Sequence, residues 1–225
     1  MSDISSLPLV IPTPDDFHSL SKLQTLAFAK ENGEYTTKQL QESQRNNYLA
    51  YQRFHKECPT HLNHCRIIKK EDCDDGVVVA AIQLQVRKRR PLVKNHSSRG
   101  GSNGDIQVFI EWIGCHPEYE GKGLGSKLLS WAMTYTKKTL QVDVLSLYVV
   151  QANQRALQLY KYKGFVLASD NRRKCRNNSR KGKNKSLYSI ICSKSMEKIV
   201  SILCLGLNKY WTVLEMEKDL LHLPR

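Results

Sequence analysis

The most constraining feature of this 225-residue chain is a strand, a glycine-rich turn and a helix that follow one another over residues 106–132. Residues 106–113 are rich in β-branched and aromatic side chains, and Pro117 ends the strand pattern because proline has no N–H to donate. Gly121, Gly123 and Gly125 then remove Cβ atoms from the backbone where a helical pattern begins. Since backbone N–H groups at a helix N-terminus bind phosphate, this stretch predicts an anion site.

The glycine spacing excludes two common phosphate-binding motifs. A P-loop has four residues between its glycines, and the dinucleotide fingerprint reads G-x-G-x-x-G, whereas residues 121–125 read G-x-G-x-G. The turn resembles instead the acyl-CoA-binding motif of the GNAT acyltransferase superfamily, Arg/Gln-x-x-Gly-x-Gly/Ala, with residues 115–117 in place of the usual V-x-P. One position departs from the family pattern, because Glu120 stands where the family has Arg or Gln.

A second motif supports this resemblance. Residues 144–150 form a strand pattern, and the chain then places Asn153, Ala156, Tyr160 and Gly164-Phe165 in the family's N-x-x-A-x-x-x-Y-x-x-x-G-F spacing. Two motifs in the expected order are much harder to obtain by accident than one. The resemblance covers residues 106–168.

The resemblance implies an α+β fold with helices on both faces of a central twisted, mostly antiparallel mixed sheet, which is splayed between its fourth and fifth strands. We expect strands at residues 9–11, 66–69, 76–86, 106–113, 144–150, 164–168 and 211–216. We expect helices from Thr13 onward, over residues 36–54, after the glycine turn, and over residues 153–163. The length suits a single domain over residues 1–225.

The net charge of +14 is concentrated in two segments. Residues 87–99 contain six Lys or Arg and residues 171–185 contain eight, with no acidic residue in either. We interpret residues 87–104 and 170–185 as flexible, solvated insertions. The alternatives are an acidic or nucleic-acid partner and a nuclear import signal. Residues 186–207 predict an additional inserted helix.

Other features point to an intracellular protein without a metal. No apolar run is long enough for a membrane span, and the N-terminus lacks the basic start of a signal peptide. We therefore expect a cytoplasmic protein, with the nucleus as the alternative. Seven scattered cysteines favour reduced thiols. A His/Cys cluster between residues 55 and 73 lacks the spacing of a zinc site, so we expect no metal.

The resemblance implies that acetyl-CoA is the co-substrate. Its diphosphate would face the backbone amides of the glycine turn, and its pantetheine arm would pair like an extra strand with residues 113–115. The implied cofactor-binding residues are Ile113, Gly114, Cys115, Glu120, Gly121, Lys122, Gly123, Leu124, Gly125, Ser126, Asn153, Ala156 and Tyr160. A carboxylate at position 120 would either repel the diphosphate or point into solvent.

The transfer needs a proton donor for the leaving thiolate and a base for the amine. Tyr160 matches the family tyrosine that donates this proton. Glu111 is the candidate base; regular strand alternation puts it on the face of Cys115, and a bulge would change this. We expect direct transfer in a ternary complex, with the backbone N–H near Cys115 polarising the thioester, rather than a covalent route through the Cys115 thiol.

The expected function is therefore N-acetylation of a primary amine on a small molecule, peptide or protein. Glu31, Glu34 and Tyr35 are the candidate acceptor contacts, because the family builds one wall of the acceptor site in this region. The protein would be a monomer or a homodimer. The alternative is a catalytically degenerate GNAT fold that senses CoA or binds nucleic acid through its basic segments.

Overall fold

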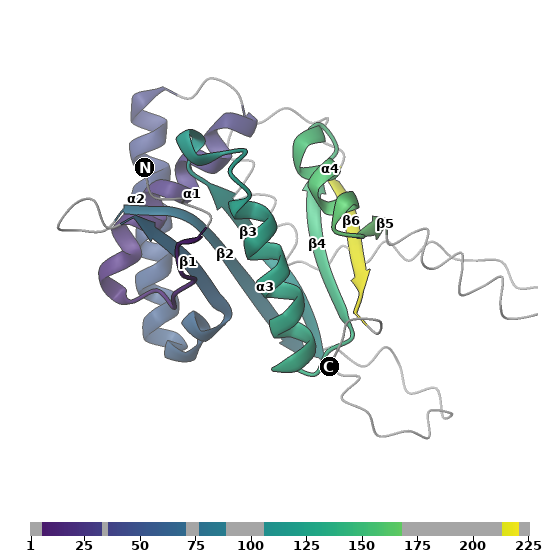
Figure 1. Cartoon of the computed structure of the whole chain (residues 1–225). Coiled ribbons are helices and arrows are strands. Elements are labelled where there is room, and N and C mark those ends of the chain that lie inside the picture. Colours follow the sequence, from purple (N-terminus) through teal and green to yellow (C-terminus); the bar gives the residue numbers. More distant parts are fainter. Residues whose placement is uncertain (1–5, 33–35, 71–76, 89–105, 168–212, 221–225) are drawn as a thin grey trace, which may run out of the picture.

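The computed structural model describes residues 6–32, 36–70, 77–88, 106–167 and 213–220 (Figure 1). The main helices are α1 (Phe17–Asn32), α2 (Thr37–Glu57), α3 (Leu124–Lys138) and α4 (Gln154–Tyr162). The strands are β1 (Cys65–Lys70), β2 (Val77–Lys88), β3 (Ile106–Cys115), β4 (Val144–Val150), β5 (Val166–Leu167) and β6 (Val213–Asp219). Short 3-10 helices are η2 (Pro14–Asp16), η3 (Pro59–His64) and η4 (Pro117–Tyr119).

The six described strands form one sheet in the order β1-β2-β3-β4-β6-β5. Only β3 and β4 pair in parallel among them, and the other neighbours are antiparallel. This confirms the expected mixed, mostly antiparallel sheet. Residues 9–11 contribute no strand, only an isolated bridge between Val10 and Ile67, so the expected fourth and fifth strands are β3 and β4.

The sheet is splayed where it was expected to be. The ladder between β3 and β4 runs only from Val108 opposite Leu145 to Ile110 opposite Leu147. Beyond it, β3 continues to Cys115 and stays paired with β2, while β4 continues to Val150 and stays paired with β6. The carboxyl-terminal parts of β3 and β4 therefore diverge, as Figure 1 shows.

Helices cover both faces of the sheet (Figure 1). Leu20 and Leu23 of α1 and Tyr51 of α2 pack in one buried cluster with Trp112 of β3. The opposite face carries a larger cluster that includes α3 and α4, whose fully buried members include Leu128, Leu129, Leu145 and Phe165. The helices thus divide the core into two layers, one on each side of the sheet.

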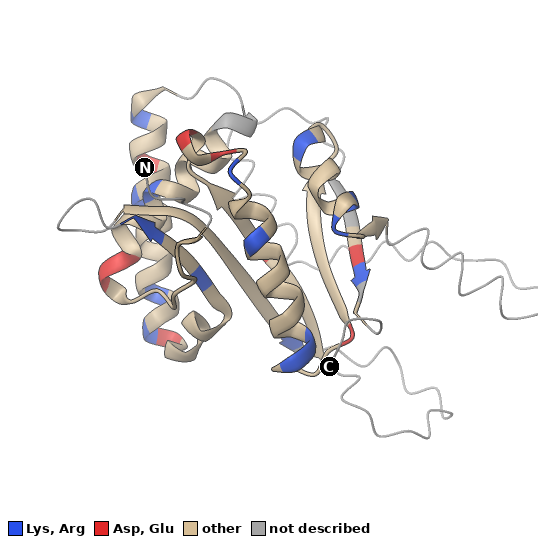
Figure 2. Ribbon diagram, viewed as in Figure 1, with Lys and Arg blue, Asp and Glu red and all other residues tan. Residues whose placement is uncertain are grey.

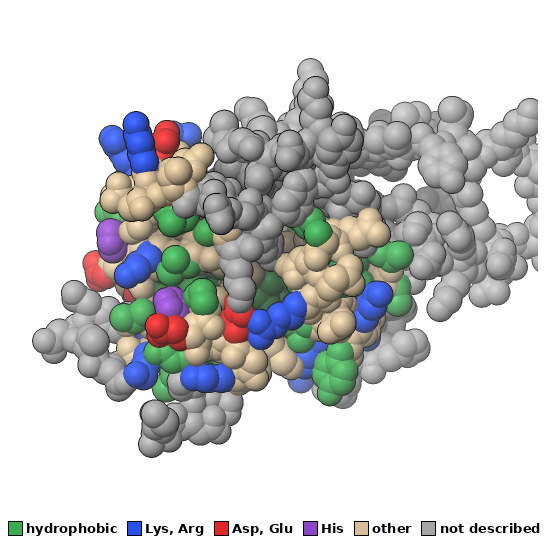
Figure 3. Space-filling view, turned by 90° about the horizontal axis from the view of Figure 1, so that it is seen from above, with side chains coloured by type: hydrophobic (Ala, Val, Ile, Leu, Met, Phe, Trp, Pro, Cys, Tyr) green, Lys and Arg blue, Asp and Glu red, His purple; other side chains and the backbone are tan. Residues whose placement is uncertain are grey.

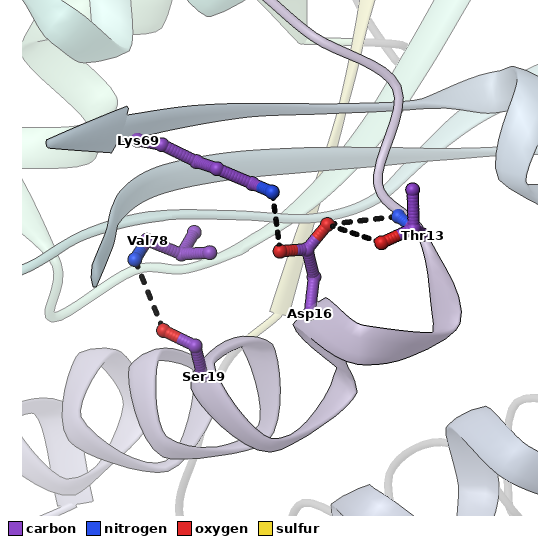
Figure 4. Close-up of polar contacts among 5 residues, drawn as sticks. All are labelled: Thr13, Asp16, Ser19, Lys69 and Val78. Carbon is purple, nitrogen blue, oxygen red and sulfur yellow. Dashed lines mark hydrogen bonds and ion pairs between the residues drawn. The ribbon is translucent and has the colours of Figure 1, made fainter. Parts of the chain in front are cut away.

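The start of α1 is fixed to the sheet by a buried carboxylate (Figure 4). Asp16 accepts hydrogen bonds from the N–H of Thr13 at 2.8 Å and from its hydroxyl at 3.2 Å. Its other oxygen pairs with the Lys69 ammonium of β1 at 2.6 Å, and the Ser19 hydroxyl accepts the N–H of Val78 at 3.0 Å. A buried carboxylate with this many partners sets where α1 docks.

Several expected segments lie outside the described residues. These are residues 89–104 of the first basic segment, the second basic segment at residues 170–185 and the inserted helix at residues 186–207. Residues 87 and 88 belong to β2. No helix in the described ranges is both long and apolar enough to span a bilayer. The described cysteines, Cys58, Cys65 and Cys115, carry free thiols.

Candidate active site

Beyond its ladder with β4, one edge of β3 has backbone N–H and C=O groups that no neighbouring strand faces in the described residues. The N–H of His116 donates to the carbonyl of Val79 at 2.8 Å, which fixes the phase of the β2–β3 ladder. Because antiparallel pairs alternate between hydrogen-bonded and non-hydrogen-bonded, the N–H and C=O groups of Ile113 and Cys115 point away from β2. They face the side on which β4 no longer pairs.

The glycine turn ends in a helix N-terminus that has no side-chain cap. Gly121 and Gly123 have φ angles of +79° and +81°, which residues with a Cβ rarely adopt. Gly123 is the N-cap of α3 and has no side chain to accept an N–H of the first turn. The positive end of α3 therefore faces outward with backbone donors, as an anion site requires.

The remaining motif residues divide between packing and surface. Leu124 is fully buried, so only its backbone can contact a ligand. A Cβ on Gly125 would lie 3.3 Å from Leu159 Cδ2, so this glycine permits the close approach of α3 and α4. Lys122 is exposed and places its ammonium 4.8 Å from the centre of the Tyr119 ring. The Ser126 carbonyl accepts the Ser130 hydroxyl inside α3.

The Glu120 side chain is paired and does not point into solvent, and its place beside the diphosphate stays a prediction. Its carboxylate forms an ion pair with the Arg155 guanidinium of α4, and its side chain is largely shielded from solvent. In Figure 2 the turn before α3 carries acidic and basic residues and α4 carries basic ones, and Figure 3 shows side chains of both charges next to each other when the molecule is seen from above. Sequence reasoning did not identify Arg155, because it occupies an unspecified position of the second motif.

The Cys115 thiol lies behind this turn, half-buried, and accepts the backbone N–H of Gly125. Burial raises its pKa to about 11, and the Glu120 carboxylate adds to the rise, while Arg155 opposes it. The thiol is therefore protonated at neutral pH, which is the wrong state for a nucleophile.

Gly114 has a packing role that sequence reasoning missed. A Cβ at this position would lie 2.8 Å from the Cβ of Ala27 in α1. The glycine therefore allows α1 to approach β3 directly, and its side-chain direction faces away from the α3 layer. The expected contact of Gly114 with the cofactor would therefore use its backbone atoms alone.

The second motif forms α4 as expected. Asn153 is its N-cap, and the Asn153 side-chain oxygen accepts the N–H of Ala156 at 3.0 Å. Tyr160 is buried, on the side of α4 that faces the core, with its ring centre 5.9 Å from that of Phe165. Asn153 is thus a helix cap whatever else it binds, and Tyr160 contacts the same core layer as Cys115.

Glu111 sits at a bulge. Gln83 lies opposite Trp112 and Leu84 lies opposite Ile110, so Glu111 is the extra residue of β3. The bulge coincides with the last β3–β4 pair at Ile110, where the two strands begin to diverge. Regular alternation is broken here, and Glu111 therefore does not share the face of Cys115.

The Glu111 carboxylate instead bonds to Gln83, which lies on the α1/α2 side of β2. Gln83 Nε2 donates to it at 3.0 Å, and Gln83 Oε1 accepts the Trp112 indole N–H at 3.0 Å. Glu111 is an exposed residue, yet the protein atoms packed around its carboxylate desolvate it. This desolvation raises the pKa of Glu111, against the opposing effects of Arg87 and Gln83. Gln83 is a second site residue that the sequence pattern did not indicate.

The expected acceptor contacts are not described. Glu34 and Tyr35 lie outside the described residues, and Glu31 is described only as part of the backbone of α1. Within the described part of the chain, no group of three or more His, Cys, Asp or Glu side chains could hold a metal ion.

The family profile described as "Acetyltransferase (GNAT) family" matches residues 23–165 of the chain. This match spans more than half of the sequence. The protein belongs to the GNAT acetyltransferase family. The matched region contains β3, the glycine turn, α3, β4 and α4, so the family assignment and the geometry at the splay concern the same residues.

Two characterised relatives match parts of the chain. Mycothiol acetyltransferase of Propionibacterium freudenreichii subsp. shermanii is 34% identical over 70 residues, which cover 31% of this chain and 21% of that enzyme. S-(2-succino)cysteine N-acetyltransferase of Bacillus subtilis is 28% identical over 109 residues, which cover 48% of this chain and 58% of that enzyme. The chain thus spans about a fifth of the first relative and just over half of the second.

The fold is that of solved family members. The PaiA N-acetyltransferase of Thermoplasma acidophilum, solved in complex with coenzyme A, superposes with a TM-score of 0.55. The superposition covers 95% of this chain and 99% of that structure at 15% sequence identity. At this identity the likeness concerns the fold alone.

Proposed function

We propose that the protein is an N-acetyltransferase that transfers the acetyl group of acetyl-CoA to a primary amine by direct attack in a ternary complex. One observation carries this proposal: the outward-facing backbone groups of Ile113 and Cys115 lie at the splay, beside an α3 N-terminus that has no side-chain cap. The first can bind an extended, amide-bearing arm, and the second can bind phosphate. Acetyl-CoA contains both groups on one molecule.

The glycine turn fits such a ligand. Gly121 and Gly123 have positive φ angles and no side chain that could stand between the backbone donors and an approaching phosphate. The space beside Gly123 is open, since a Cβ built there would meet nothing within 4 Å. The N–H of Cys115 would donate to the thioester carbonyl, where negative charge develops during attack. Asn153 and Ala156 would contact the ligand from the start of α4.

The chemistry needs one proton removed and one proton supplied. The amine nitrogen attacks the carbonyl carbon, the new C–N bond forms, the C–S bond breaks, and the thiolate leaves. Glu111 would take the amine proton, directly or through water, from the α1/α2 side of the sheet, because its carboxylate faces that side. Tyr160 would protonate the thiolate from the opposite side, where it shares a core layer with Cys115. The bulge at Glu111 thus separates base and acid onto two sides of β3.

Direct transfer agrees with the state of Cys115. A thiol with a pKa of about 11 is almost entirely protonated at neutral pH, so an acetyl-cysteine intermediate would form slowly. The acceptor would enter from the side of Glu111, and Glu31, Glu34 and Tyr35 remain the proposed acceptor contacts.

Two measurements on the full chain test the proposal. Titration calorimetry with acetyl-CoA should give a one-to-one complex, and thiol release should then depend on an added amine from a panel of polyamines, arylalkylamines, amino acids, aminoglycosides and peptide N-termini. No heat with acetyl-CoA would refute the proposal. Binding without release from any amine would favour the alternative of a CoA-sensing module.

A further inference from the structure

We propose that Arg155 is the cation that binds the phosphates of acetyl-CoA in this protein, and that Glu120 is a positioning residue that holds the Arg155 guanidinium over the glycine turn. The inference rests on the proposed function, since it names a further binding residue of the same site. It also accounts for a carboxylate at a position where the motif carries Arg or Gln.

Two contacts place the guanidinium over the turn. Arg155 Nη1 pairs with Glu120 Oε2, and Arg155 Nη2 lies 3.8 Å from the point that a Cβ on Gly121 would occupy. Gly121 lies two residues before the N-cap of α3. The guanidinium therefore lies beside the backbone donors that would face the phosphates.

The two partners of the ion pair differ in how far they are exposed to solvent. The Arg155 side chain is 64% exposed and the Glu120 side chain is 24% exposed, so the carboxylate lies beneath and the cation lies outside. An arriving anion would meet the guanidinium first. Guanidinium carries five N–H donors in a planar fork, so it can bind Glu120 through one edge and a phosphate oxygen through another.

Charge explains why both residues are needed. A lone carboxylate at position 120 would oppose the binding of a diphosphate, whereas the ion pair with Arg155 cancels that charge. The other cations near the turn have different contacts: Lys122 lies over the Tyr119 ring at 4.8 Å, and Lys127 donates to the Leu7 carbonyl at 2.6 Å. Arg155, by contrast, forms an ion pair with the Glu120 carboxylate of the turn.

The test is a set of calorimetric titrations with CoA, 3′-dephospho-CoA and pantetheine. Arg155→Gln should weaken CoA binding by roughly tenfold or more, because a charge-assisted contact is lost and the Glu120 carboxylate no longer has the Arg155 charge beside it. The loss should be similar with dephospho-CoA, which keeps the diphosphate, and absent with pantetheine, which has no phosphate. The difference between wild type and variant should shrink as salt rises.

The CoA affinity of the Glu120→Gln/Arg155→Gln double variant separates the roles of the two residues most clearly. Glu120→Gln alone should change CoA affinity by less than about threefold, since it removes a positioning contact and a like charge together. In the Arg155→Gln background the same change should restore several-fold of the lost affinity, because only the repulsion remains to be removed. Lys161→Gln, an exposed charge removal later on α4, is the matched control and should bind CoA like wild type.

Four results would overturn the inference about Arg155 and Glu120. An Arg155→Gln variant that binds CoA within twofold of wild type would overturn the inference and leave the proposed function standing. An equal loss with pantetheine, or a double variant no better than Arg155→Gln, would show that the pair only maintains the fold. A wild-type protein that binds neither CoA nor dephospho-CoA would overturn both proposals.

Discussion

The Gln83 amide of β2 donates a 3.0 Å hydrogen bond to the Glu111 carboxylate at the bulge of β3. The same side chain accepts the Trp112 indole N–H at 3.0 Å, so its orientation is fixed from the buried side. This contact lowers the pKa of Glu111 against a larger rise caused by desolvation. Two residues of the neighbouring strand, Arg87 and Gln83, therefore reduce a pKa rise that desolvation causes.

Gln83→Leu should move the acid limb of the kcat/KM profile to higher pH. The substitution removes one of the two contacts that lower the pKa of Glu111, and a base is active only when deprotonated. Gln85→Leu, two residues along β2, is the control and should leave the limb in place. An unchanged limb for Gln83→Leu would mean that another group titrates in the profile.

Glu111→Gln should lower kcat by ~10² and abolish the acid limb, as expected for loss of a general base.

The same substitution should change how the free energy of unfolding depends on pH. A raised carboxyl pKa in the folded state means that the contribution of Glu111 to stability is present in full at low pH and is lost as the pH rises through the folded-state pKa. Relative to wild type, Glu111→Gln should therefore gain stability as the pH rises above the ordinary carboxyl pKa of about 4 and through the raised folded-state pKa of Glu111, as measured in urea titrations. A parallel pH dependence in the two proteins would contradict this.

Tyr160→Phe should lower kcat by ~10² or more with little change in acetyl-CoA affinity, because only the proton donor is lost. Tyr162→Phe is a matched control on the same helix, since that side chain is 82% exposed. Rates and calorimetric affinities should be measured for both variants. Equal rates for Tyr160→Phe and wild type between about pH 6 and pH 9 would assign Tyr160 to the core alone.

Cys115→Ala should retain kcat within about fivefold, because a thiol with a pKa of about 11 carries little thiolate at neutral pH. Intact mass spectrometry after incubation with acetyl-CoA, without amine, should show no acetylated enzyme for wild type. A stable adduct that disappears in Cys115→Ala would instead establish a covalent intermediate.

Gly114→Ala should destabilise the fold by ~1 to 3 kcal/mol, because its new Cβ would lie 2.8 Å from that of Ala27. Urea unfolding measures the loss. Ala27→Gly in α1 costs about 1 kcal/mol by itself through helix propensity. The double variant should be more stable than the sum of the two changes predicts, since the contact is removed. Additive losses would show that α1 shifts freely away from β3.

The sequence alone determined the local elements and the family. Strand, turn and helix at the glycine motif, the Asn153 cap and the strand at residues 144–150 follow from residues close together in the chain, and the structure has them nearly at the expected bounds. Local backbone preference and capping operate over a few residues, so a single sequence reveals them.

Only the tertiary structure decided which distant residues meet. Arg155 reaches Glu120 across 35 positions, Gln83 reaches Glu111 across 28, and Ala27 of α1 meets Gly114 of β3. The bulge that turns Glu111 away from the face of Cys115 depends on the register between β2 and β3, which no short-range pattern specifies. These contacts arise when whole elements pack against one another, and that packing is a property of the folded chain rather than of any segment in it.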